Sequence, residues 1–132
     1  MIGILIVSHG SFGDALIHSA SHVLGKRPLQ VQQMGVAVHD DPDAILPRAR
    51  ELLRQLDTGD GVLVLTDMLG ATPSNIATRL LEAGRVEGLA GASLPMLIRA
   101  LTYREGAELP DLLVKTQSGA IEGVVRMEHR ER

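Results

Sequence analysis

Apolar runs of strand length alternate along the chain with segments whose apolar residues recur at helical spacing. Two runs have no polar interruption, at residues 2–7 and 62–65. A third, at 86–92, is softened by Gly88 and Gly91, and a more polar one lies at 29–38. A continuous apolar run is typical of a strand that is covered on both faces, as in a parallel sheet. Apolar residues three or four positions apart predict helices between these strands and after the last of them, at about 12–24, 42–56, 73–83, 95–104 and 110–122.

Capping residues support these boundaries. Asp41 and Thr72 each stand directly before a proline, the arrangement of an N-cap followed by the first helical residue. Ser11 is placed to cap the first helix, and Gly25 is suited to ending it.

Strands that alternate with helices through right-handed crossovers predict an α/β fold, a doubly wound and mostly parallel sheet with helices on both faces. We expect residues 1–132 to form one such domain. The flavodoxin-like strand order 2-1-3-4 makes the first and third strands neighbours, so a ligand crevice is expected at their carboxyl ends. Residues 123–127 are expected to form a short terminal strand.

Composition narrows the classes of function. With 45% hydrophobic residues the chain is not disordered, and with one Phe, one Tyr and no Trp it has almost no rings on which nucleobases could stack. A net charge of −3 gives no electrostatic footprint for nucleic acid, and the absence of cysteine excludes a thiolate metal site or a catalytic thiol. No apolar run approaches the roughly 18 residues of a membrane span, and no signal peptide precedes the first strand. We therefore expect a cytoplasmic protein with no nucleic-acid partner and no membrane insertion.

Polar residues collect at the two strand ends that should border the crevice. His9 and Gly10 follow the first strand, and Asp67 follows the third. A neutral imidazole can attack a phosphoryl group through one nitrogen when a carboxylate holds the N–H of the other. We therefore predict that His9 accepts a phosphoryl group and that Asp67 orients it.

The helices that begin at these loops provide backbone N–H groups for an anion. Gly10 leaves room for close approach, and Ser11 caps the helix beside His9. Neither a Walker A motif nor a carboxylate cluster for Mg²⁺ is present, so ATP is not the expected phosphoryl donor. No metal and no cofactor are expected.

These residues make the chain similar to a known family. The stretches 4–10 (ILIVSHG), 66–75 (TDMLGATPSN) and 94–97 (LPML) resemble the mannose-type enzyme IIA domain of the bacterial phosphoenolpyruvate-dependent sugar phosphotransferase system. The resemblance implies that His9 is phosphorylated by the phosphocarrier HPr and passes the group to an enzyme IIB, with Asp67 as its hydrogen-bonded partner. It also implies that a loop cradles the phosphate, formed by Gly70, Ala71, Thr72 and Ser74.

The resemblance implies further features of the assembly. The family is usually a homodimer whose sheet carries an antiparallel edge strand, which here would be residues 123–127. Some relatives carry a linker and a IIB domain, and this sequence does not, so the acceptor is expected to be a separate protein at a membrane permease. Two positions depart from the family pattern: Ala71 replaces a second glycine, and the loop 39–42 (HDDP) replaces the usual Pro-Gly and acidic residue.

Other functions compete with this one. A small cobalt or iron chelatase would use His9 as a metal ligand, but the expected second histidine late in the sheet is missing between His39 and His129. A phosphotransfer subunit of dihydroxyacetone kinase has a histidine at the same strand end, and a regulatory module would use phosphorylation of His9 as a switch. His18 and His22, four residues apart, are read as solvated helix positions.

Overall fold

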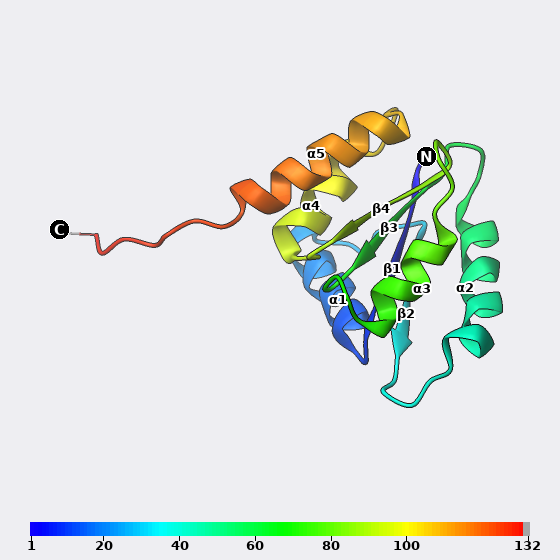
Figure 1. Ribbon diagram of the computed structural model, residues 1–132. Coiled ribbons are helices and arrows are strands. Elements are labelled where there is room, and N and C mark those ends of the chain that lie inside the picture. Colours follow the sequence, from blue (N-terminus) through cyan, green and yellow to red (C-terminus); the bar gives the residue numbers. More distant parts are fainter. Residues whose placement is uncertain (131–132) are drawn as a thin grey trace.

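The computed structural model describes residues 1–130, in which four strands alternate with helices and a fifth helix follows the fourth (Figure 1). The strands are β1 (Gly3–His9), β2 (Val31–Val36), β3 (Val62–Thr66) and β4 (Val86–Ala90). The helices are α1 (Phe12–Leu24), α2 (Pro42–Leu56), α3 (Thr72–Leu80), α4 (Leu94–Tyr103) and α5 (Leu109–Glu122).

The four strands form one parallel sheet in the order β2-β1-β3-β4. This is the predicted doubly wound α/β topology. Val7 of β1 is in register with Thr66 of β3, and His9 is in register with Val36 of β2. The loops that follow β1 and β3 therefore leave the sheet side by side at its carboxyl edge.

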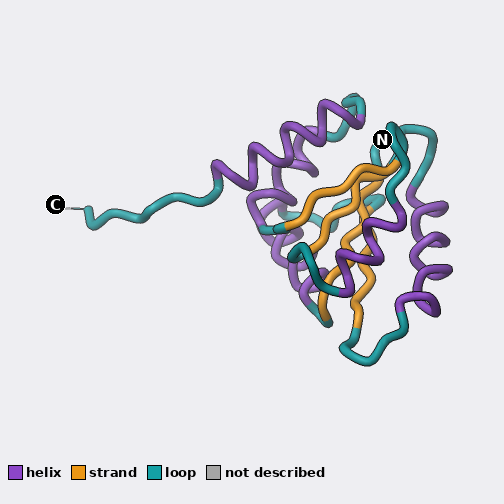
Figure 2. Tube along the Cα trace, in the orientation of Figure 1, coloured by secondary structure: helices purple, strands orange, loops and turns teal. Residues whose placement is uncertain are grey.

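Helices cover both faces of the sheet, as the uninterrupted apolar strands predict (Figures 1 and 2). One core layer packs α1, α4 and α5 against side chains that include Ile4, Ile6 and Leu65. The other packs α2 and α3 against side chains that include Leu5 and Val64. Successive residues of a strand point to opposite faces, so β1 and β3 contribute to both layers.

The capping predictions are confirmed for the end of α1 and the start of α2, confirmed in position only for Ser11 at the start of α1, and wrong for Thr72 at the start of α3. Gly25 ends α1 in a left-handed conformation, and the Asp41 side chain accepts a hydrogen bond from the backbone N–H of Asp43 at the start of α2. The Ser11 side chain makes no capping hydrogen bond. The N-cap of α3 is Ala71, so Thr72 is the first helical residue. A proline is tolerated in either of the first two helical positions, which is why the sequence placed this cap one residue late.

The expected edge strand at 123–127 is wrong for the single chain. Helix α5 ends at Glu122, and in the described part of the chain the residues after it form no strand but run away from the sheet (Figure 1). Val124 and Met127 are 86% and 93% exposed. This segment contains both apolar and charged residues. Because it leaves the end of α5 pointing away from the sheet, no surface of its own chain is close enough to cover its apolar side chains.

Candidate functional site

The sheet brings His9 and Asp67 into direct contact at its carboxyl edge. His9 is the last residue of β1, and Asp67 directly follows β3. The His9 Nδ1 atom lies 2.7 Å from the Asp67 Oδ2 atom, and the backbone N–H of His9 donates to the same oxygen at 3.0 Å. The His9 side chain is 46% exposed whereas that of Asp67 is 15% exposed, so the ring reaches solvent while its partner lies beneath it.

The other carboxylate oxygen of Asp67 is held by its own loop. Oδ1 accepts a hydrogen bond from the backbone N–H of Met68 at 3.0 Å. Burial on its own would raise the pKa of Asp67, but the hydrogen bonds from the His9 backbone and ring, the charge of His9 and the Met68 N–H outweigh it. The pKa of Asp67 is therefore lowered from its ordinary value. The carboxylate stays ionised and continues to accept from the His9 ring.

This contact sets the chemistry of the imidazole. When a carboxylate accepts from Nδ1–H, the neutral ring carries its lone pair on Nε2. The exposed side of the ring thus presents a nucleophilic nitrogen. The Nδ1 hydrogen bond to Asp67 Oδ2 fixes the ring, and the His9 backbone N–H holds the same oxygen in place. Such an arrangement suits a nucleophile that forms a covalent bond with an incoming electrophile.

Gly10 turns the chain sharply away from β1, and a glycine of the neighbouring strand makes the turn possible. Gly10 has a φ of +49°, and its N–H donates to the carbonyl of Val36 at 3.1 Å. A Cβ at Gly35 would lie only 2.2 Å from the Gly10 carbonyl oxygen. Sequence reasoning missed Gly35, although a glycine inside a strand is a recognised signal of close backbone approach.

The loop before α3 is held by hydrogen bonds to a buried side chain of that helix. Gly70 has a φ of +89°, and the N–H groups of Gly70 and Ala71 both donate to the Ser74 hydroxyl. Ser74 is buried. The sequence analysis predicted Ser74 as a phosphate ligand. The sequence alone does not reveal that the Ser74 hydroxyl already has hydrogen-bond partners in the loop.

The predicted phosphate-binding residues therefore differ in what they can still offer. The N–H groups of Gly10, Gly70 and Ala71 already have acceptors, and so has the Ser74 hydroxyl. The hydroxyls of Ser11 and Thr72 make no side-chain capping contact, and helix geometry leaves the first N–H groups of α1 and α3 without intrahelical acceptors. A Cβ added at Gly10 or Gly70 would meet nothing within 4 Å, so both glycines face open space beside His9 and the α3 loop.

The remaining histidines do not join this site. His18 and His22 stack with ring centroids 6.4 Å apart on the exposed side of α1, and His39 lies exposed in the loop after β2. Within residues 1–130 no group of three or more side chains of His, Cys, Asp or Glu is placed to hold a metal ion.

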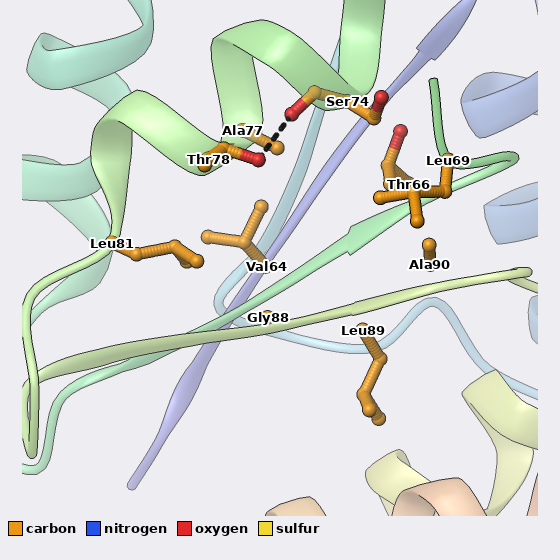
Figure 3. A pocket seen from close by; sticks show the side chains of 10 residues that line it. All are labelled: Val64, Thr66, Leu69, Ser74, Ala77, Thr78, Leu81, Gly88, Leu89 and Ala90. Atoms are coloured by element: carbon orange, nitrogen blue, oxygen red, sulfur yellow. Dashed lines mark hydrogen bonds between the residues drawn. The ribbon is translucent and has the colours of Figure 1, made fainter. Parts of the chain in front are cut away.

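A small pocket of about 110 Å³ lies between α3, β3 and β4 (Figure 3). Its walls are mostly apolar, as Val64, Leu81 and Leu89 illustrate, and it includes neither His9 nor Asp67. The reactive groups therefore lie on an open edge of the sheet and not in this cavity.

Comparison with known proteins agrees with this geometry. Residues 3–117 match the family described as PTS system fructose IIA component, where PTS is the phosphotransferase system. The chain belongs to this IIA family. A relative, the fructose-specific EIIA component of Bacillus subtilis, is 30% identical over 86% of this chain and 77% of its own length. The EIIA component from Streptococcus agalactiae has the same fold, with a TM-score of 0.84 and 28% identity over 96% of this chain and 97% of that one.

The mannose-specific EIIAB component of Escherichia coli is 31% identical over 86% of this chain but only 35% of its own length. The chain thus spans about a third of that relative. Family membership supports a role as a phosphotransfer carrier in the sugar phosphotransferase system. Among the described residues, no helix is both long enough and apolar enough to cross a membrane.

Proposed function

We propose that this IIA protein is a phosphohistidine carrier that accepts a phosphoryl group from phospho-HPr on His9 and passes it to an enzyme IIB. The observation that carries the proposal is the hydrogen bond between His9 Nδ1 and Asp67 Oδ2. The Nε2 lone pair attacks phosphorus, an N–P bond forms, and the bond between phosphorus and the donor breaks. The Nδ1 proton stays in place, and Asp67 stabilises the positive charge that the ring acquires. Transfer to IIB reverses these steps with a new acceptor.

The phosphoryl oxygens meet the first turns of α1 and α3. Ser11 and Thr72 are our proposed ligands, because their hydroxyl and N–H groups remain available. Gly10 and Gly70 serve the same site by shape, since the space beside each is empty and lets the partner's phosphoryl group come close. This form of catalysis consists of positioning and electrostatic stabilisation.

The surroundings of His9 support transfer between proteins. Phe12, Met68 and Leu69 follow β1 and β3 at the same edge and are 38%, 56% and 75% exposed. Exposed apolar side chains near a reactive group mark a docking surface for a protein partner. We propose that HPr and IIB dock here in turn, with IIB belonging to a membrane permease that this protein meets in the cytoplasm.

The first experiment is phosphorylation by phosphoenolpyruvate, enzyme I and HPr, followed by intact mass measurement. We expect an acid-labile gain of one phosphoryl group in the native protein and none in His9→Ala. His18→Ala is the matched control, because it removes an exposed histidine on α1 that takes no part in the site, and it should gain the group like the native protein. Phosphorylation of His9→Ala, or none of the native protein, would contradict the proposal. Tight binding of Co²⁺ at His9 in place of phosphorylation would favour the chelatase.

We further propose that the protein is a homodimer. In the strand order β2-β1-β3-β4 the outer edge of β4 has no partner strand within the described residues, only a single bridge from Glu82 to Val86, while Val124, Val125 and Met127 are exposed. A second copy supplies what the single chain lacks, namely a strand to pair with β4 and apolar surface to cover the exposed residues. The dimer is tested by sedimentation: replacing Val125 and Met127 by Asp should give monomers, whereas Val23→Asp on exposed α1 surface should not.

A further inference from the structure

The hydroxyl of Ser74, in the first turn of α3, makes three hydrogen bonds to the backbone of the preceding loop. Its Oγ accepts hydrogen bonds from the backbone N–H groups of Gly70 at 2.9 Å and Ala71 at 3.2 Å, and it donates to the Ala71 carbonyl at 2.8 Å. A hydroxyl has one proton and two acceptor sites. All three are used, so the Ser74 hydroxyl has no capacity left for a phosphoryl oxygen.

Ser74 is also fixed from the side of the helix. The Thr78 hydroxyl donates to the Ser74 carbonyl at 2.8 Å, one turn further along α3 (Figure 3). Ser74 itself is only 2% exposed. The hydroxyl therefore joins a buried part of α3 to the loop before it. That loop contains Gly70, which has open space where a side chain would be.

The identity of the N-cap explains why such a tie is needed. The N-cap of α3 is Ala71, whose methyl side chain cannot accept a hydrogen bond. A serine, threonine, aspartate or asparagine at this position would tie down the first turn by itself. Here Ser74, at the third helical position, reaches back to the N-cap N–H and forms half of a capping box.

We propose that Ser74 is a positioning residue of the phosphoryl-transfer site, an inference that rests on the function proposed above. Its hydroxyl occupies the N–H groups of Gly70 and Ala71 and so fixes the backbone on the N-terminal side of Thr72. The phosphoryl group is then bound by the N–H and hydroxyl of Thr72, which the tie leaves free and holds in one orientation. Gly70 and Ala71 shape the loop and do not donate to the phosphoryl group.

The test compares Ser74→Ala with Ser74→Thr, which keeps a hydroxyl, and with Thr102→Val, which removes an exposed hydroxyl that donates to the Ile98 carbonyl within α4. Amide hydrogen exchange at Gly70 and Ala71 reports the tie directly, without any phosphorylation. We expect Ser74→Ala to raise both exchange rates and to lower kcat for transfer from HPr about tenfold with little change in KM, the loss expected for one or two hydrogen bonds. Ser74→Thr should restore both properties, and Thr102→Val should leave both unchanged.

A second measurement follows the amide resonances when the native protein is phosphorylated. We expect the Thr72 N–H resonance to move downfield and those of Gly70 and Ala71 to stay in place. A downfield shift at Gly70 or Ala71, or native kcat in Ser74→Ala, would overturn the inference while leaving the carrier function intact. Should Ser74→Ala fail to fold, the shifts in the native protein and the transfer rate of Ser74→Thr decide. If the native protein takes up no phosphoryl group, the proposed function itself fails.

Discussion

At the scale of the residue, Asp67 fixes His9 through two hydrogen bonds to a single carboxylate oxygen. Asp67→Asn keeps the shape of the side chain but removes the charge that, in the proposed mechanism, stabilises the ring after it attacks phosphorus. A hydrogen bond to a charged group contributes about 1.5–3 kcal/mol, which corresponds to a rate reduced by roughly 10- to 100-fold. We expect this loss in the rate of phosphorylation by HPr, measured by rapid quench, with a native circular dichroism spectrum.

The matched control for that variant is Asp60→Asn, which changes an exposed carboxylate at the opposite end of β3. It should transfer at the native rate. If Asp67→Asn also transfers at the native rate, Asp67 has no part in the mechanism. The sequence could place Asp67 near His9, because both follow buried strands that a doubly wound sheet makes neighbours. It could not show that the His9 backbone N–H donates to the same oxygen, because every residue except proline has a backbone N–H and the residue type does not tell which acceptor it finds.

At the scale of the element, the turn after β1 depends on the neighbouring strand β2. Gly35→Ala would place a methyl group 2.2 Å from the Gly10 carbonyl oxygen, so the turn that carries His9 and Gly10 must shift. We expect a loss of about 1–3 kcal/mol in the free energy of unfolding, the usual cost of overpacking, together with slower phosphorylation. Urea denaturation and the HPr assay measure the two effects.

Gly88→Ala in β4 is the control for this variant. Its added methyl group would meet the end of the flexible Leu81 side chain at 3.1 Å and the Val64 carbonyl oxygen at 3.4 Å, contacts that small shifts relieve. It should leave phosphorylation unchanged. A native transfer rate in a folded Gly35→Ala protein would show that the turn does not depend on β2.

The link between α2 and β3 is held by Asp57. Its carboxylate accepts from the N–H groups of Gly59 at 2.9 Å and Gly61 at 3.1 Å and pairs with Arg85. The Gly59 N–H is the largest influence on the pKa of Asp57; with the Gly61 N–H and Arg85 it outweighs burial, and the pKa is lowered. A lowered pKa in the folded state means that the ionised carboxylate adds stability above its unfolded pKa, and that this stability is lost as the pH falls through the folded pKa.

We therefore expect Asp57→Asn to be less stable than the native protein at pH 7 by about 1 kcal/mol, the difference between a charge-assisted and a neutral hydrogen bond. The difference should vanish in strong acid, where both side chains are uncharged. Urea denaturation of both proteins between pH 7 and pH 2 measures it. A gap that stays constant over this range would mean that the carboxylate charge is not what stabilises the link.

The elements themselves were predictable where burial alone decides them. The uninterrupted apolar runs of β1 and β3 require cover on both faces, and the helices around them supply it. The edge strand expected at 123–127 depends on something outside the local pattern. Val124, Val125 and Met127 have the composition of a strand, but whether they form one is decided by which edge they can reach.

At the scale of the whole molecule, the candidate site lies at one end of the sheet and a buried arginine contact lies at the other. The carboxyl edge carries His9 and the open loops, whereas the amino edge is closed by Arg104 from the end of α4. Arg104 is 4% exposed and donates to the carbonyls of Ile2 at 3.3 Å, Gln30 at 3.2 Å and Leu29. Burial lowers the pKa of its guanidinium, with Glu105 opposing the shift, but an arginine remains charged at neutral pH. One side chain thus joins segments about 75 to 102 positions away in the sequence.

Arg104→Met fills the same space with an apolar chain and removes the guanidinium donor from the carbonyls of Ile2 and Leu29, while the Gln30 carbonyl keeps the Ile4 N–H. Because the Ile2 carbonyl is buried and an unsatisfied buried acceptor costs about 1–3 kcal/mol, we expect the free energy of unfolding to fall by about that amount. Arg54→Met is the control: it removes an exposed ion pair with Glu51, which contributes less than about 1 kcal/mol.

Since Arg104 lies at the edge opposite to His9, the folded Arg104→Met variant should accept a phosphoryl group within about twofold of the native rate, roughly 0.4 kcal/mol in barrier. Denaturation and the HPr assay on the same preparation separate the two properties. Slower transfer in a fully folded Arg104→Met protein would mean that the amino edge also shapes the site, through the long axis of β1 that connects them.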